Sequence, residues 1–348
     1  MNDGGSGPRE FFYGFTGLKE AGVPVELVEE DDFGAAPSSW RTGRRITGLI
    51  HRLTGLSAPS IAKYAQADVL SRLNAYDVIV ATTNSQGMTM AFLRAWGCLR
   101  ARVLFIPMGV LELNAPLLKR AVCKRLMRHV ALAPLAQAEE DYLGRRLGSG
   151  IDIKRLPFGV DAQFWTAAEV NKSDGDYVLS IGNDWSRDYA TLASAWHPEY
   201  PPLKVVTGLP VPPSAGSLEV IAGDWKRQLL SDEKVRDLFR GARFVVLPIR
   251  QTVQPSGQSA CIQAMACGKA VILSDIAGLW SREIMADGKT CLLTPPGSVE
   301  GLQKAVEELL GNPKRVDEMG RYARQAVDDH FNLEIMTKAL KLRLETLI

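Results

Sequence analysis

The loop Arg250–Gly257 and the residues after it have the composition of an anion site. The loop follows an apolar segment (FVVLPI), contains Pro-Ser-Gly, and runs into a helical segment that opens at Gln258 and Ser259. The free N–H groups and the dipole of a helix N-terminus attract anions. Small residues such as Ser256 and Gly257 let a phosphate approach the backbone. Many such turns in α/β proteins bind nothing, so the stretch alone favours a phosphate site without establishing one.

Strands and helices alternate along the chain, as in parallel sheets covered by helices. Apolar segments predict strands at 23–28, 76–81, 101–106, 177–181, 204–207, 243–248, 270–274 and 290–293. Amphipathic segments predict helices at 10–21, 115–128, 132–147, 299–310, 316–330 and 333–348. The alternation breaks at Leu156–Asp161 and then restarts. This pattern predicts two Rossmann-like halves, with ligands at the carboxyl ends of the strands.

Composition narrows the class of protein. With 348 residues, 46% of them hydrophobic, the chain is long enough for two domains. A formal net charge of +2 gives no reason to expect a nucleic-acid partner. The five cysteines have no metal-ligand spacing, and we expect reduced thiols and no metal. No apolar run reaches the ~18 residues of a membrane span, and Met1–Arg9 lacks the apolar core of a secretory signal. We therefore expect a cytoplasmic protein, free or at the inner face of the cytoplasmic membrane.

Several motifs in a fixed order resemble those of the retaining, family-four (group 1) glycosyltransferases. The segment 263–272 (QAMACGKAVI) is similar to the family's EAMACGKPVI, and DGKT at 287–290 and LLTPPG at 292–297 follow it. PFGVD at 157–161, with Phe164, resembles the interdomain signature, and IGN at 181–183 with RDY at 187–189 resembles a phosphate loop. The resemblance is close from Val130 to the C-terminus and loose before it.

The resemblance implies the α/β fold called GT-B, in which two Rossmann-like domains face a cleft and a C-terminal helix crosses back to the N-domain. It places an acceptor domain at 1–165, a nucleotide-sugar domain at 166–330 and the crossing helix at 331–348. It also implies a nucleoside diphosphate sugar as donor, transfer with retention, and no obligatory metal or other cofactor. The acceptor is then an unknown glycan or lipid-linked molecule, in the assembly of surface glycans.

The family's phosphate loop carries an Arg and a Lys. Asn183 occupies the Arg position and Arg187 lies near the Lys position, so the resemblance makes Arg187 the main cation for the diphosphate. The family's paired glutamates fall on Pro255 and Gln263. An amide at Gln263 can still bind the ribose hydroxyls. Pro255 cannot contact the donor sugar, and Gln258 on the same loop is the expected substitute.

The implied site residues are therefore Arg187 and Gln258 for catalysis, and Gly4, Gly5, Gly182, Asn183, Ser256, Gly257, Ser259 and Gln263 for the donor. Gly4 and Gly5 match a family glycine loop, but the strand that should precede them is missing. Without the resemblance, the same glycines are typical of a loose terminus.

Three readings stay open on function. Pro255, Asn183 and Met108, which replaces a family histidine, favour a catalytically weakened GT-B protein that binds a nucleotide or a partner. The helical segment with the family-like QAMACGK motif, together with Arg187, favours the enzyme. A dehydrogenase ranks last, because no G-x-G-x-x-G follows a strand.

Two surface features also have alternatives. The basic helix at 115–128 could face anionic lipid, and a solvated helix face explains it equally well. Trp185, in the phosphate loop, either touches the donor or packs in the core.

Overall fold

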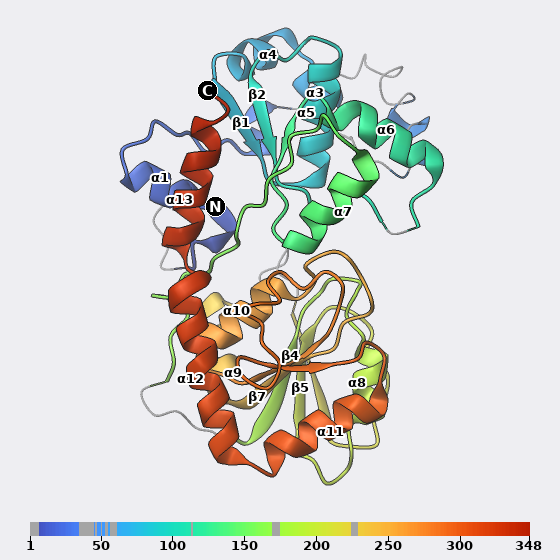
Figure 1. Cartoon of the computed structure of the whole chain (residues 1–348), viewed down its shortest axis with the longest axis vertical. Coiled ribbons are helices and arrows are strands. Elements are labelled where there is room, and N and C mark those ends of the chain that lie inside the picture. Colours follow the sequence, from blue (N-terminus) through green and yellow to red (C-terminus); the bar gives the residue numbers. More distant parts are fainter. Residues whose placement is uncertain are drawn as a thin grey trace. The chain divides into compact units, whose positions relative to one another are not determined.

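The computed structural model describes residues 7–34, 45, 47–49, 51, 52, 55, 61–112, 114–168, 175–223 and 229–348. The chain forms two compact units (Figure 1). The C-terminal unit contains Phe158–Met336 and the described part of Met1–Gly14. The N-terminal unit contains Phe15–Pro157 and Thr337–Ile348. These units differ from the domains expected at 1–165 and 166–330: the change comes at Phe158, and the first residues group with the C-terminal unit.

The sheet of the N-terminal unit is parallel and has the order β1-β2-β3. Its strands are β1 (Val78–Ala81), β2 (Arg102–Phe105) and β3 (Ala131–Leu132). Its helices are α1 (Phe15–Glu20), α3 (Ile61–Tyr64), α4 (Ala67–Leu73), α5 (Asn84–Ala95), α6 (Leu117–Met127) and α7 (Gln137–Leu147), with a short 3-10 helix at Glu30–Phe33.

The predicted strand at 23–28 is wrong. These residues form no ladder, and no described residue before Val78 lies in a strand. Pro24 has no N–H to donate to a ladder, and Glu26 instead accepts hydrogen bonds from Arg72 and Tyr76. The predicted helix 10–21 is also shorter than expected, because it forms only a 3-10 turn at Glu10–Phe12 and α1.

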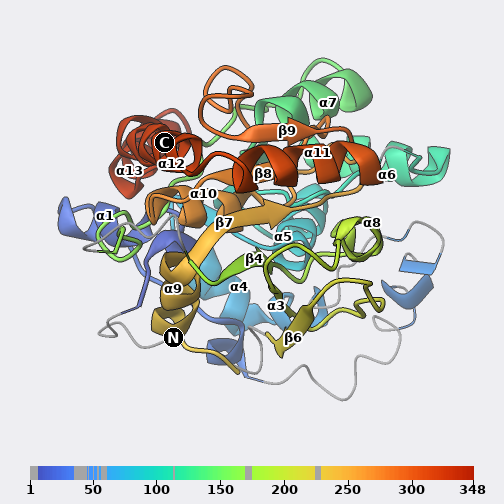
Figure 2. The same ribbon diagram turned by 90° about the horizontal axis from the view of Figure 1, so that it is seen from below.

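The C-terminal unit is built on a six-stranded parallel sheet with the order β6-β5-β4-β7-β8-β9 (Figure 2). The strands are β4 (Tyr177–Ile181), β5 (Leu203–Thr207), β6 (Leu218–Ala222), β7 (Ala242–Leu247), β8 (Val271–Ser274) and β9 (Leu292–Thr294). The helices are α8 (Tyr189–Ala195), α9 (Asp232–Gly241), α10 (Gln258–Ala266), α11 (Val299–Leu310), α12 (Pro313–His330) and α13 (Leu333–Glu345), of which α13 continues into the N-terminal unit.

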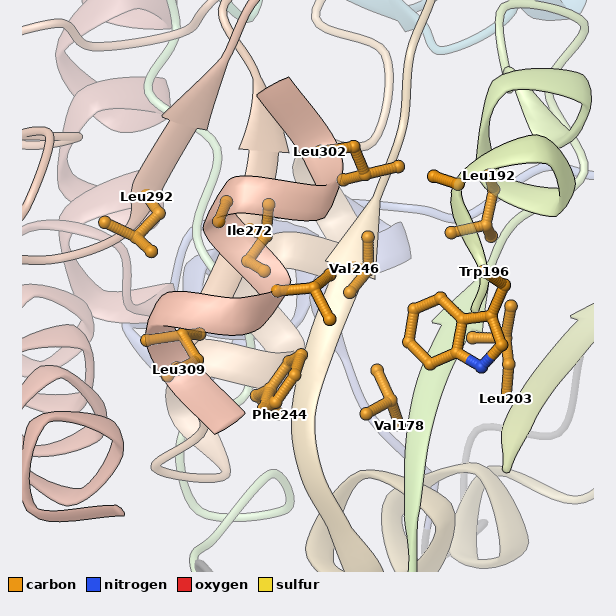
Figure 3. Packing of buried hydrophobic residues seen from close by; sticks show 14 of the residues in the cluster. Val178, Leu192, Trp196, Leu203, Phe244, Val246, Ile272, Leu292, Leu302 and Leu309 are labelled. Carbon is orange, nitrogen blue, oxygen red and sulfur yellow. The ribbon is translucent and has the colours of Figure 1, made fainter. Parts of the chain in front are cut away.

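Buried apolar side chains hold this sheet under α8 and α11 (Figure 3). Phe244 and Val246 of β7 meet Ile272 of β8, and Leu302 and Leu309 of α11 pack over them. The strands are apolar at nearly every position because both faces of a parallel sheet are covered. This explains why the strands at 177–181, 243–248 and 270–274 were predictable, and their predictions are confirmed.

The sheet order contains one reversal. The chain starts at β4 in the middle, moves outward to β6, and then returns to β7 on the other side of β4. Parallel sheets bind ligands at such a switch point, beyond the carboxyl ends of the two strands. The loops after β4 and β7 are therefore the first place to look for a site. No helix among the described residues is long and apolar enough to cross a membrane.

Candidate functional site

The loops after β4 and β7 are joined by backbone hydrogen bonds. Asp188 N donates to Pro248 O at 3.0 Å and Arg250 N donates to Ser186 O at 2.7 Å. An isolated antiparallel bridge pairs Arg187 with Ile249 between them. The two loops thus form one continuous platform, and the side chains of Arg187 and Ile249 point to the same side of it.

Arg187 lies almost completely inside this platform, with 4% of its surface exposed. Its guanidinium is wedged between two glycines: a Cβ on Gly182 would be 2.2 Å from Arg187 Nε, and a Cβ on Gly257 would be 3.1 Å from Nη1. Both glycines have positive φ, +149° and +77°. Any other residue at either position would be strained and would displace the guanidinium.

The charge of Arg187 is only partly balanced. Nε is 2.9 Å from Asp184 Oδ2, but Asp184 is half exposed and also accepts a hydrogen bond from Ser256 Oγ. Nη1 is buried and has no hydrogen-bond partner among the described residues, whereas Nε has only this ion pair with Asp184. A buried donor without a partner costs ~1–3 kcal/mol, and more when it is charged.

The helix beside Arg187 adds more positive potential. Gly257 is the N-cap of α10, and no side chain caps this helix end. The helix N-terminus therefore keeps its partial positive charge next to a guanidinium that already lacks partners. An anion with several acceptor oxygens would satisfy both groups at once, and a phosphate has this chemistry.

The structure brings together five of the residues proposed from the sequence: Gly182, Arg187, Ser256, Gly257 and Gln258. Ser256 and Gln258 are both buried, and Ser259 is half-buried one position along α10. Gly4 and Gly5 lie outside the described residues.

Asn183 lies at the same sheet edge, but its side-chain amide forms hydrogen bonds within the protein. Its Oδ1 accepts hydrogen bonds from Gly208 N at 2.6 Å and Thr207 Oγ1 at 3.1 Å, and its Nδ2 donates to Gly223 O. These bonds tie the loop after β4 to the ends of β5 and β6. A contact between Asn183 and the nucleotide-sugar donor stays a prediction.

Gln263 is buried on the second turn of α10 and donates from Nε2 to Glu10 Oε1 at 2.9 Å. Sequence reasoning placed Glu10 in an ordinary helix and missed this contact. No local sequence pattern predicts the contact between Gln263 and Glu10, because the two residues are 253 positions apart in the chain. Trp185 is 81% exposed, which rules out the alternative of packing in the core.

The carboxyl edge of the N-terminal sheet holds a second residue that the sequence did not reveal. Glu139, in the first turn of α7, is 2% exposed and its Oε1 accepts a hydrogen bond from Gly109 N at 3.0 Å. Its Oε2 has no partner among the described residues. Burial raises the pKa of Glu139 to about 7, and the hydrogen bond from Gly109 only partly opposes that rise.

Nearby, Asn84 and Met108 exchange two hydrogen bonds, of 2.8 Å and 2.9 Å. Met108 is the residue that stands where the resemblance expects a histidine. Within the described ranges, no group of three or more His, Cys, Asp or Glu side chains is arranged to hold a metal ion.

We expect Glu139→Gln to make stability less sensitive to pH. The folded-state pKa lies above the ordinary 4.5, so the cost of ionising Glu139 is absent at low pH and grows as pH rises from about 4.5 through about 7. Glutamine can accept the same hydrogen bond from Gly109 without this cost, which is on the order of 2–3 kcal/mol. The variant should therefore melt above wild type at pH 8, with a smaller difference at pH 5. Thermal melts across this range test it, with Glu140→Gln as the control, and an equal difference at both pH values would contradict it.

Comparison with known proteins agrees with this geometry. Residues 222–312 match the family model described as glycosyl transferases group 1, a range that includes β7, α10 and β8. The chain is 26% identical over 205 residues to alpha-maltose-1-phosphate synthase from Mycolicibacterium smegmatis, covering 50% of this chain and 51% of that protein. It is 33% identical over 91 residues to D-inositol 3-phosphate glycosyltransferase from Gordonia bronchialis, covering 26% of this chain and 19% of that protein. The matched part thus spans about half of the first of these curated relatives and about a fifth of the second.

Solved structures extend the likeness to most of the chain. Sucrose-phosphate synthase from Thermosynechococcus elongatus has a TM-score of 0.69 at 19% identity, over 83% of this chain and 78% of that one. HepE from Anabaena in complex with UDP-glucose has a TM-score of 0.66 at 16% identity, over 95% and 88% of the two chains. At these identities the likeness concerns the fold. In sequence, residues 222–312 match the group 1 glycosyltransferases, and in fold the chain is an α/β protein of the GT-B type.

Proposed function

We propose that this protein is a glycosyltransferase that moves a sugar from a nucleoside diphosphate donor to an acceptor hydroxyl. The observation that carries the proposal is the buried, incompletely partnered guanidinium of Arg187 at the uncapped N-terminus of α10. This arrangement lies at the switch point of the sheet, between the two loops that a nucleotide would contact. The match over residues 222–312 supports the reaction class, and the UDP-glucose complex of the similar HepE fold supports the donor class.

The proposed chemistry follows from where negative charge develops. The bond between the anomeric carbon and the diphosphate oxygen breaks, and its electron pair leaves on the diphosphate. The acceptor oxygen forms a new bond to the anomeric carbon and releases its proton. Fixed donors aimed at the leaving diphosphate stabilise the transition state more than the ground state. Arg187 and the N–H groups around Gly257 are those donors. Retention of configuration, a hexosyl group, and activity without a metal belong to this proposal through the resemblance.

The binding-only alternative has less support. Asn183 cannot supply the missing charge, but Gly182, Arg187, Ser256 and Gly257 all remain in one site. A bound nucleotide would explain these groups under either reading, and the match of residues 222–312 to the group 1 glycosyltransferases is what favours the enzyme.

A thermal-shift screen against UDP-, GDP-, TDP- and ADP-sugars tests the function. A ligand at a hundredfold over its dissociation constant stabilises the folded state by ~2.7 kcal/mol. We expect one base to raise the melting temperature, and the matching donor to release free nucleoside diphosphate when acceptor candidates are added. Stabilisation without any release or transfer would favour the binding-only alternative. A screen in which no nucleotide shifts the melting temperature would contradict the enzyme and the nucleotide-binding form of the alternative, and would leave only partner binding.

We expect Arg187→Ala to damage turnover more than Gln263→Ala. Loss of a donor that acts on the leaving group costs about 10²–10³-fold in kcat. Gln263 would hold the ribose equally in ground and transition states, so its loss should raise KM more than it lowers kcat. Steady-state kinetics with the identified donor measure both. Arg315→Ala, on α12 in the same unit, is the matched control because its partners, Glu308 and the carbonyl of Gly288, lie outside the proposed site. Near-normal kcat in Arg187→Ala would eliminate the proposed role.

We further propose that the protein works at the inner face of the cytoplasmic membrane, on surface glycan or glycolipid assembly. Helix α6 supports this. Leu117 is 77% and Leu118 49% exposed, and Lys124 and Arg125 are exposed on the same helix. Lys119 does not contribute, because it is buried and its Nζ is 3.2 Å from Glu112 Oε1. Exposed apolar side chains beside cations suit an anionic lipid surface.

For this membrane contact we expect salt-sensitive flotation with anionic vesicles. Each cation near such a surface adds ~1 kcal/mol, so Lys124→Gln with Arg125→Gln should weaken binding by about tenfold or more. Lys314→Gln with Arg321→Gln, on exposed positions of α12, removes the same charge elsewhere and should leave binding unchanged. Equal losses in the two double variants would show that only net charge matters.

A further inference from the structure

Glu10 is a fully buried carboxylate inside the C-terminal unit, although it lies near the start of the chain. Its Oε1 accepts hydrogen bonds from Trp165 Nε1 at 2.6 Å and from Gln263 Nε2 at 2.9 Å, and its Oε2 accepts one from Asp161 N at 3.3 Å. Burial raises the pKa of Glu10, and the hydrogen bond from Gln263 is the largest opposing effect. The three hydrogen bonds hold the Glu10 side chain in one position inside this unit.

The contact with Glu10 fixes the orientation of the Gln263 amide. An amide has a donor end and an acceptor end, and either can face a given direction. A carboxylate only accepts, so Nε2 must face Glu10 and Oε1 must face away. Among the described residues, none donates a hydrogen bond to Gln263 Oε1. Gln263 therefore offers a fixed, unoccupied acceptor.

This acceptor lies at a useful distance from the anion site. Gln263 is six residues beyond Gly257, the N-cap of α10. At 1.5 Å per residue that is about 9 Å along the helix. Ser259 and Gln263 are four residues apart and share one helix face. The spacing suits a nucleoside diphosphate whose phosphates lie at the helix N-terminus and whose ribose lies over the second turn.

We propose that Glu10 is a positioning residue for nucleotide recognition: it turns Gln263 so that the amide oxygen accepts a hydrogen bond from a ribose hydroxyl. This rests on the proposed function, since it assumes that a nucleotide occupies the site. Glu10 itself does not touch the nucleotide. With Glu10 in place, an uncharged Gln263 presents only an acceptor to the ribose, which is what a glutamate at that position would present.

A purely structural role for Glu10 is the competing explanation. The segment that carries Glu10 is also held by Arg9, whose Nε is 2.8 Å from Asp161 Oδ2. If Glu10 only anchored this segment, its loss would lower the melting temperature and leave ribose selectivity unchanged. Arg9→Ala loosens the same segment without removing a contact to Gln263, and it is therefore the control.

The test measures ribose selectivity by calorimetric titration of the full chain. The probes are UDP, GDP and ADP, each compared with its 2′-deoxy and 3′-deoxy forms. We expect wild type to prefer the ribonucleotide by about tenfold, the value of one hydrogen bond of ~1.4 kcal/mol. Glu10→Ala should reduce this preference to near one. Glu10→Gln should retain most of it, because its side-chain oxygen still accepts from Gln263. Arg9→Ala should lower only the melting temperature.

The same measurements in the Gln263→Glu variant provide a second test. A glutamate at 263 has two acceptor ends and needs no orienting partner. Gln263→Glu alone places a second carboxylate against Glu10, so it should weaken ribonucleotide binding. Adding Glu10→Ala to Gln263→Glu should then restore affinity and selectivity. The decisive readout is ribose preference: loss of Glu10 should reduce it beside Gln263 and leave it intact beside Glu. Relief of repulsion between two carboxylates changes stability and overall affinity, but it does not by itself produce this difference in ribose preference.

Three results would overturn the proposal. The first is a Glu10→Ala variant that keeps the ribose preference of wild type. The second is a Gln263→Glu variant that binds ribonucleotides more tightly than wild type while Glu10 is present, and this readout serves even where Glu10→Ala does not fold. The third is a wild-type protein that binds nucleoside diphosphates with no ribose preference. Failure of wild type to bind any nucleoside diphosphate would instead reject the proposed function itself.

Discussion

The guanidinium of Arg187, held between the backbones of Gly182 and Gly257, is the contact on which the C-terminal unit's site depends. It exists because β4 and β7 are neighbours although two strands separate them in sequence. Their loops join through the bonds at Ser186 and Pro248, and the joined loops leave room only for glycine on either side of the cation. A buried cation next to an uncapped helix is unfavourable without an anion. A negatively charged ligand would therefore stabilise this site.

The surrounding residues determine which groups a ligand at this site can contact. Asp184 balances part of the charge of Arg187 and also accepts a hydrogen bond from Ser256, so it links the loop after β4 to the N-terminus of α10. Asn183 closes the ends of β5 and β6 instead of adding charge. Farther along α10, Glu10 holds Gln263. The result is a row of groups on one helix, with cationic and backbone donors at its start and a neutral acceptor about 9 Å away.

Much of this could be predicted because it is local. The apolar segments predicted every strand of the C-terminal sheet except β6, and the resemblance implied that Arg187, Ser256 and Gly257 share a site. What the sequence did not reveal depends on distant partners. The role of Glu10 requires Trp165 and Gln263 to arrive at the same place, and the raised pKa of Glu139 requires burial under a loop. The segment at 23–28 alternates like a strand, but alternation does not supply a neighbouring ladder. Helix α5 was not among the predicted helices, although Thr83 accepts from Gln86 N as an N-cap should.

The most direct test of the account is a calorimetric comparison of a nucleoside, its monophosphate and its diphosphate on the wild-type protein. If Arg187 and the α10 N-terminus require an anion, affinity should rise at each step by about tenfold or more, the worth of a charge-assisted hydrogen bond of ~1.5–3 kcal/mol. The gain should shrink as salt is added, because salt screens the attraction. Equal affinity for all three ligands, or a gain that salt does not reduce, would contradict the claim that this cation and this helix form a phosphate site.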